Sequence, residues 1–89
     1  MKNEFTLLIV DDDKGMHYLL RRYFRNSLNR LISAEDGEAG LNIMFGQTVS
    51  LVLLDLKMPG MGGMAILKVA LKKRPGIPVI IFTGRADYG

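Results

Sequence analysis

Short apolar runs alternate regularly along the chain with segments of helical spacing, and this alternation constrains the fold most. The runs are continuous, as is typical of strands that are covered on both faces of a parallel sheet. They lie at Phe5–Val10, Arg30–Ala34, Val49–Leu54 and Ile77–Phe82, of which the second is the weakest. The order βαβαβαβ predicts an α/β fold, in which a parallel sheet carries helices on both faces.

Three helices are predicted between these runs, because apolar residues recur there at intervals of three and four. The predicted core-facing residues are Met16, Leu19, Leu20, Tyr23 and Phe24 in the first helix, Leu41, Met44 and Phe45 in the second, and Met64, Leu67, Ala70 and Leu71 in the third. Asp13 is the predicted N-cap of the first helix, Asp36-Gly37 marks the turn into the second, and Pro75-Gly76 ends the third. His17 lies off the first apolar stripe, so a solvated surface position is expected for it.

Length and composition indicate one domain over residues 1–89. A hydrophobic content of 48% is too high for a disordered chain, and the apolar runs are too short to cross a bilayer. The absence of cysteine excludes disulfides and thiolate metal sites. We therefore expect a cytoplasmic domain without a membrane partner.

The net charge of +3 arises from basic residues on two predicted helices. These residues are Arg21, Arg22 and Arg25 in the first helix, and Lys68, Lys72, Lys73 and Arg74 at the end of the third. Tyr23 and Phe24 lie among the basic residues of the first helix, but both belong to its predicted core-facing stripe, so they are not expected to form the stacking platform of a single-strand nucleic-acid site. Solvated helix surfaces are the favoured interpretation, and no direct nucleic-acid contact is expected of this segment.

Polar residues follow the apolar runs where strands are predicted to end: Asp11-Asp12, Asp55 and Thr83. Ligands of open α/β sheets bind outside the carboxyl ends of the strands, where the strand order reverses. Carboxylates crowded there repel one another, and a bound divalent cation relieves the repulsion. Mg²⁺ suits a site of oxygen ligands, and a carboxylate beside it can attack a phosphoryl group. The alternative for the acidic run Asp11–Asp13 is a simple N-cap cluster near a helix dipole.

Four segments strongly resemble the receiver domains (CheY-like) of bacterial two-component response regulators. Val10–Asp13 resembles the acidic pair that follows the family's first strand, and Leu53–Met61 its acceptor strand and following loop. Ala34–Glu38 is similar to the entry to the family's second helix, and Ile80–Gly84 to its switch-threonine strand. The resemblance covers nearly the whole chain, with the segments in the family's order and spacing.

The resemblance implies a flavodoxin-like sheet with strand order 2-1-3-4, and a role for each matching residue. Asp55 resembles the phosphoacceptor and Thr83 the switch hydroxyl. Asp12 resembles the direct ligand of Mg²⁺, and Asp11 its neighbour that holds metal-bound water. The backbone carbonyl of Lys57 matches the position that completes the magnesium site.

The resemblance also implies partners. A sensor histidine kinase or a phosphotransfer protein would supply the phosphoryl group, and an output domain in the parent chain would respond to it. The domain itself would not be an enzyme, beyond its own phosphorylation from a phosphodonor.

Two departures from the family pattern stand out. The family fold continues with a helix, a strand that carries a lysine, and a last helix, whereas this chain ends at Gly89, so we expect it to be C-terminally truncated. Lys57 and Arg85 are expected at the surface, although one of them could partly replace the charge of the missing lysine. The second departure is Gly62, where the family often has an aspartate before the glycine that matches Gly63; this costs a few tenths of a kcal/mol at an N-cap.

Two other functions are consistent with parts of the pattern. A non-switching module of the same fold would serve only for interaction or dimerisation. A phosphatase of the haloacid dehalogenase type would need a second aspartate where this chain has Lys57. Without a following strand, Ile77–Phe82 would also form an uncharged sheet edge, so self-association through this edge is expected.

Overall fold

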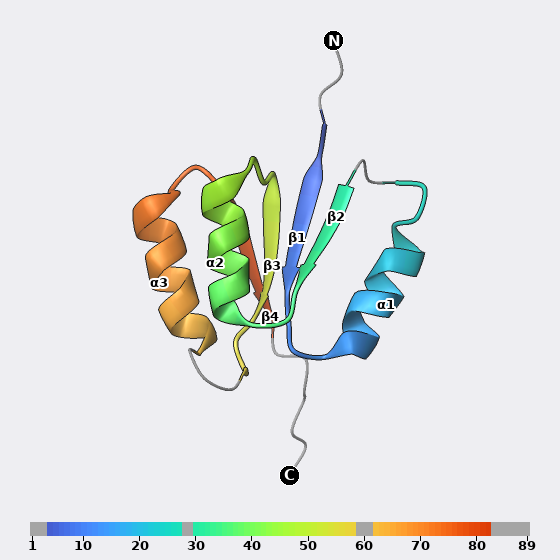
Figure 1. The fold of residues 1–89 in the computed structure, drawn as a ribbon, viewed down its shortest axis with the longest axis horizontal. Helices are drawn as coiled ribbons and strands as arrows, with labels where there is room; N and C mark the ends of the chain where they lie inside the picture. Colours follow the sequence, from blue (N-terminus) through green and yellow to red (C-terminus); the bar gives the residue numbers. More distant parts are fainter. Residues whose placement is uncertain (1–3, 28–29, 59–61, 83–89) are drawn as a thin grey trace.

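The computed structural model describes residues 4–27, 30–58 and 62–82 of the chain (Figure 1). Its strands and helices alternate as the sequence predicts. In chain order they are β1 (Thr6–Val10), α1 (Lys14–Tyr23), β2 (Arg30–Ala34), α2 (Gly37–Gly46), β3 (Leu51–Asp55), α3 (Gly63–Lys73) and β4 (Val79–Phe82). None of the described helices has the length and apolar character needed to cross a membrane.

All described strands are parallel and lie in the order β2-β1-β3-β4, which confirms the predicted flavodoxin-like order. Val10, the last residue of β1, pairs with Ala34 of β2 and with Leu54 of β3. The chain therefore passes to one side of β1 after its first strand and to the other side after its second. This reversal brings the residues that follow β1 next to the end of β3.

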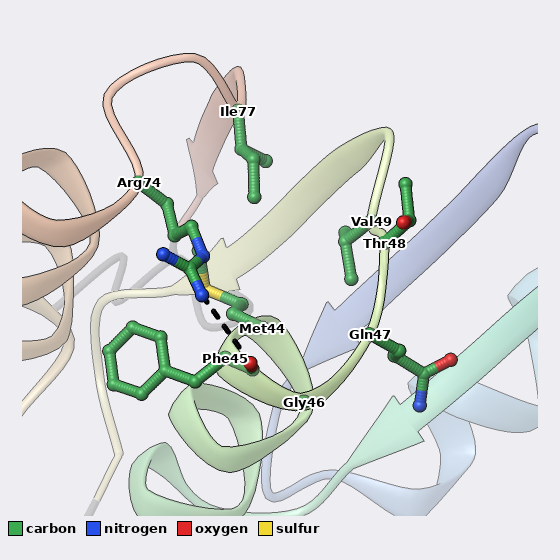
Figure 2. A pocket seen from close by; sticks show the side chains of 8 residues that line it. All are labelled: Met44, Phe45, Gly46, Gln47, Thr48, Val49, Arg74 and Ile77. Atoms are coloured by element: carbon green, nitrogen blue, oxygen red, sulfur yellow. Dashed lines mark hydrogen bonds between the residues drawn. The ribbon is translucent and has the colours of Figure 1, made fainter.

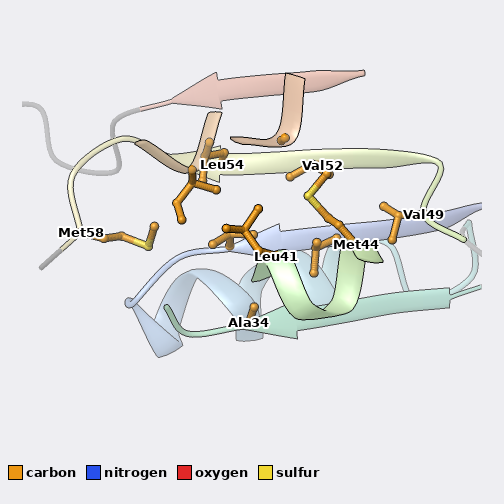
Figure 3. Close-up of a cluster of buried hydrophobic side chains, with 11 residues drawn as sticks. Ala34, Leu41, Met44, Val49, Val52, Leu54 and Met58 are labelled. Carbon is orange, nitrogen blue, oxygen red and sulfur yellow. The ribbon is translucent and has the colours of Figure 1, made fainter. Parts of the chain in front are cut away.

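The main core lies between the sheet and the pair formed by α2 and α3, which stand side by side in Figure 1. Figure 3 shows Val52 and Leu54 of β3 meeting Leu41 and Met44 of α2. The helix α2 approaches β1 closely at Gly40, where an added Cβ would lie 2.8 Å from a methyl carbon of Val10.

Strand β1 is buried on both faces, as its continuous apolar run predicts. Leu8 and Val10 belong to the main core. Leu7 and Ile9 alternate with them and so point to the opposite face, where they are also buried. The outer strand β4 differs, because Ile80 is 52% and Ile81 45% exposed. The prediction that this strand is buried was wrong, because β4 forms the edge of the described sheet.

The helix faces were predicted only in part. In α1, Leu19 and Tyr23 are 62% and 78% exposed, whereas the other three members of the predicted stripe are half-buried. In α3, Met64 and Leu71 are exposed, Ala70 is buried as predicted, and Ile66 is buried although it was not part of the predicted stripe. Phe45 of α2 is also exposed, while Leu41 and Met44 are buried as predicted. Each helix buries a narrower stripe than its apolar spacing suggests, because it packs on the sheet along one side only.

Candidate phosphoryl-acceptor and metal site

Asp11 directly follows β1 and is fixed there by its own backbone and side chain. Its N–H donates to the carbonyl oxygen of Ala34 in β2, at 3.0 Å. Its Oδ1 accepts a hydrogen bond of 3.0 Å from the N–H of Asp13, which in turn caps α1 by accepting from Gly15, as predicted. Asp11 is only 1% exposed, and its Oδ2 is buried without a hydrogen-bond partner among the described residues.

Asp55 lies on the neighbouring strand as the last residue of β3, and it is 4% exposed. Its Oδ1 accepts a hydrogen bond of 2.9 Å from the N–H of Lys57. Carboxylate oxygens of Asp11, Asp12 and Asp55 all lie within 4.8 Å of one another, and Asp12 is half-buried. The predicted convergence of strand-end carboxylates is therefore present, and the simple N-cap interpretation applies to Asp13 alone.

The crowding of these carboxylates changes their chemistry. Burial raises the pKa of Asp11 to about 6, from an ordinary value of 3.8. The hydrogen bond from the backbone of Asp13 opposes this rise, whereas the neighbouring carboxylate of Asp55 and the negative charge of Asp13 add to it. Without a cation, Asp11 therefore keeps its proton up to a higher pH than an ordinary aspartate does, and this lowers the repulsion within the cluster.

This pKa predicts how pH affects the stability of the metal-free protein. Between pH 3.8 and about 6, the folded chain holds a proton on Asp11 that the unfolded chain releases. Stability therefore falls as pH rises through this window, by about 3 kcal/mol in total. Urea unfolding in EDTA should show the fall in wild type but not in Asp11→Asn. Asp13→Asn should keep most of the fall, because the charge of Asp13 is the smallest contribution to the raised pKa of Asp11. Equal pH profiles for wild type and Asp11→Asn would contradict the prediction.

The donor set fits a hard divalent cation. All three side chains offer oxygen, and the buried Oδ2 of Asp11 has no other described partner. Mg²⁺ prefers carboxylate and carbonyl oxygens together with several waters. It therefore suits a cluster in which Asp11 and Asp55 are buried and Asp12 is half-buried. The Lys57 side chain is exposed as expected, and the role of its carbonyl remains a prediction. Thr83 and Arg85 lie outside the described residues, so their roles also remain predictions.

Two residues near the cluster have roles that the periodicity of the sequence did not indicate. Gly63 begins α3 directly against the acceptor strand: an added Cβ would lie 2.4 Å from Cα of Leu56 and 2.6 Å from the carbonyl oxygen of Asp55. His17 was predicted to be solvated, and this was wrong, because it is 7% exposed and its Nε2 lies 2.6 Å from the carbonyl oxygen of Asp11. A histidine adjacent in sequence to the half-buried Met16 can turn toward either side of a helix, so spacing alone could not place it.

A pocket elsewhere in the fold does not contribute to this site (Figure 2). It lies where α2 and α3 end and β3 begins, opposite the end of β3 that carries Asp55. The guanidinium of Arg74 lies 5.4 Å from the centre of the Phe45 ring and donates to the Phe45 carbonyl oxygen at 3.4 Å. These contacts link the ends of two helices, while the acidic cluster occupies the other end of the sheet.

Comparison with known proteins agrees with this geometry. The model of the response regulator receiver domain family matches residues 7–89. Sporulation initiation phosphotransferase F of Bacillus subtilis is 41% identical over 87 residues, which cover 98% of this chain and 69% of that protein. Transcriptional regulatory protein GlrR of Escherichia coli is 40% identical over 81 residues, or 91% of this chain; the match spans 18% of the regulator's length.

Solved structures show the same fold. Response regulator protein TrrA from Thermotoga maritima, in complex with Mg²⁺-BeF, superimposes with a TM-score of 0.84 at 30% identity. The match covers 94% of this chain and 73% of TrrA. TrrA in its complex with histidine kinase ThkA gives the same TM-score and identity, with 94% and 72% coverage. The chain described here therefore belongs to the response regulator receiver domain family.

Proposed function

We propose that this receiver domain accepts a phosphoryl group on Asp55 with Mg²⁺ bound beside it, and thereby switches an output. The observation that carries the proposal is the cluster in which carboxylate oxygens of Asp11, Asp12 and Asp55 lie within 4.8 Å of one another. The solved complex of TrrA with Mg²⁺-BeF, in a matching fold, supports it.

Each residue of the cluster has a role in this proposal. Asp12 would bind Mg²⁺ directly, Asp11 would hold metal-bound water, and the carbonyl of Lys57 would complete the site. When bound, the cation would offset the charge of the carboxylates and of the phosphoryl oxygens. Because the pKa of Asp11 is raised, protons compete with the cation for this carboxylate at low pH.

The transfer step requires Asp55 to be ionised and held in place. The N–H of Lys57 fixes its Oδ1 at 2.9 Å, which orients the carboxylate at the end of β3. A carboxylate oxygen of Asp55 attacks phosphorus, a new O–P bond forms, and the P–N bond of a phosphohistidine donor breaks. The departing imidazole nitrogen retains the electron pair of that bond and takes up a proton. The Thr83 hydroxyl is proposed to bond a phosphoryl oxygen afterwards.

The proposed donor is a sensor histidine kinase or a phosphotransfer protein. The structure of TrrA in complex with histidine kinase ThkA supports a partner of this class. GlrR, which is much longer than this chain, supports an output domain in the parent protein. We propose no enzymatic activity beyond the domain's own phosphorylation, and the cytoplasm as its location.

Beryllofluoride titration tests this function, because beryllofluoride stands in for a phosphoryl group on a carboxylate. Wild type should bind it only with Mg²⁺ present, and Asp12→Asn should lose about a hundredfold or more in affinity, since a ligand of the cation is removed. NMR titration provides the measurement. Asp13→Asn is the matched control, because Asp13 is adjacent in sequence but caps α1 instead. Binding without Mg²⁺, or no binding at all, would favour the non-switching module.

The exposed edge of β4 predicts self-association of the 89-residue chain. Ile80 and Ile81 are both exposed there, and the described part of the sheet has no strand beyond β4. Uncovered apolar edges pair with other chains. Sedimentation equilibrium should therefore show dimers for wild type, and weaker association for Ile80→Lys and for Ile81→Lys.

A control variant distinguishes association through the β4 edge from association through any exposed apolar side chain. Leu71 is 52% exposed, like Ile80, but it lies on α3. Leu71→Lys should therefore leave association unchanged. Val79 is less suitable for substitution, because it packs against the core. A monomeric wild type at high concentration, or equal effects of Leu71→Lys and Ile81→Lys, would contradict the prediction.

A further inference from the structure

His17 is the buried residue of α1, and it contacts the acidic cluster through the backbone. Its Nε2 lies 2.6 Å from the carbonyl oxygen of Asp11. A carbonyl oxygen only accepts hydrogen bonds, so Nε2 must carry a proton and donate it. The Nδ1 atom is also buried and has no partner among the described residues. A leucine would fill the same space without burying an unpaired nitrogen. The feature that favours histidine here is therefore the hydrogen bond made by Nε2.

That bond completes the fixation of Asp11. The N–H of Asp11 is held by Ala34, its Oδ1 by Asp13, and its carbonyl oxygen by His17. Only Oδ2, within the cluster, is left without a described partner. One bond from β2 and two from α1 and its N-cap thus determine where the remaining oxygen lies.

The bond also affects Asp12. The carbonyl of Asp11 belongs to the same planar peptide group as the nitrogen of Asp12. If this peptide rotated, the backbone would leave β1 in another direction, and the Asp12 carboxylate would move as well. Holding the carbonyl therefore keeps Asp12 oriented toward Asp55.

We infer that His17 is a positioning residue, which sets the Asp11–Asp12 peptide so that the carboxylates of the cluster are arranged before a cation binds. Supporting groups of this kind raise metal affinity, because the site then needs no rearrangement on binding. The part of the inference that concerns the cation rests on the proposed Mg²⁺ site. The part that concerns the peptide stands on the hydrogen bonds alone.

A competing explanation is that His17 only anchors α1 to the sheet. Arg21 provides the matched control, because its Nη2 donates to Oγ of Ser33 in β2 at 2.9 Å. This bond also links α1 to the sheet, but it contacts none of the clustered aspartates. Arg21→Leu therefore removes an anchor without releasing the Asp11 carbonyl.

The first measurement is Mg²⁺ affinity by isothermal titration at fixed pH. His17→Leu should bind Mg²⁺ about tenfold more weakly, at the lower end of the loss seen for supporting groups. His17→Gln should recover most of the affinity, because its amide N–H₂ can donate to the same carbonyl. Arg21→Leu should bind like wild type. Equal losses in His17→Leu and Arg21→Leu would overturn the inference and leave His17 as an anchor.

The second measurement needs no metal. In EDTA, the backbone amide resonance of Asp12 should shift in His17→Leu and remain near its wild-type position in Arg21→Leu and His17→Gln. An unshifted Asp12 amide in His17→Leu would overturn the inference. If His17→Leu does not fold, the test depends on His17→Gln. Wild-type Mg²⁺ affinity and an unshifted Asp12 amide in this variant support the inference. Weaker Mg²⁺ binding together with a shifted Asp12 amide overturns it. Absence of Mg²⁺ binding by wild type would instead refute the proposed metal site, and the Asp12 amide would still test the role of His17.

Discussion

Acetyl phosphate should label the wild-type chain with one phosphoryl group in the presence of Mg²⁺, and it should leave Asp55→Asn unlabelled. The loss should be complete, because a neutral amide has no carboxylate oxygen to attack phosphorus. Asp12→Asn should slow labelling by about a hundredfold, the usual scale for removing one source of electrostatic stabilisation. Intact-mass spectrometry after rapid quenching measures the label, and peptide mapping locates it.

Two other aspartates serve as controls for this experiment. Asp13 and Asp36 are exposed, and each caps a helix by accepting a backbone N–H. Asparagine caps helices about as well as aspartate. Asp13→Asn and Asp36→Asn should therefore keep both their fold and their label. A label found on Asp12, or one that survives in Asp55→Asn, would refute the proposed acceptor.

The sheet and the position of the acidic cluster follow from sequence patterns with direct physical meaning. A continuous apolar run such as that of β1 is stable only where both faces are covered, which requires a parallel sheet with crossover helices. The ends of parallel strands lie at one edge of the sheet, so Asp11 and Asp55 had to approach one another once β1 and β3 were neighbours. The sequence alone could thus predict the fold and the clustering of Asp11, Asp12 and Asp55, while the roles of Thr83 and of the Lys57 carbonyl remain predictions.

The helix faces and the role of His17 depend on information that the local pattern lacks. Apolar residues such as Leu19 and Leu20 fit the same periodicity, but only their contacts with the sheet decide which one is buried. His17 is buried because it donates to a carbonyl of another segment. Hydropathy carries no signal for a hydrogen bond of this kind, so a polar residue beside an apolar stripe was assigned to solvent.

The local sequence pattern also fails to show the importance of Gly63, where substitution is expected to cause the largest loss of stability. Gly63→Ala should lower the free energy of unfolding by about 3 kcal/mol or more, the upper range for overpacking. The added Cβ would lie 2.4 Å from Cα of Leu56 and 2.6 Å from the carbonyl oxygen of Asp55. Both atoms belong to backbone, which cannot turn aside as a flexible side chain can. Helix propensity alone predicts the opposite sign, since alanine stabilises a helix relative to glycine by up to about 1 kcal/mol.

Gly62→Ala is the matched control, because the two glycines are adjacent but only a Cβ at Gly63 would meet backbone atoms. No atom lies within 4 Å of a Cβ placed at Gly62, which is the N-cap of α3 and has ordinary extended backbone angles. This substitution should cost less than about 1 kcal/mol, the scale of an N-cap change. Urea unfolding of wild type and both variants measures the difference. If Gly63→Ala were as stable as Gly62→Ala, the start of α3 would have room to move away from the acceptor strand, and the close contact behind Asp55 would not be needed for the fold.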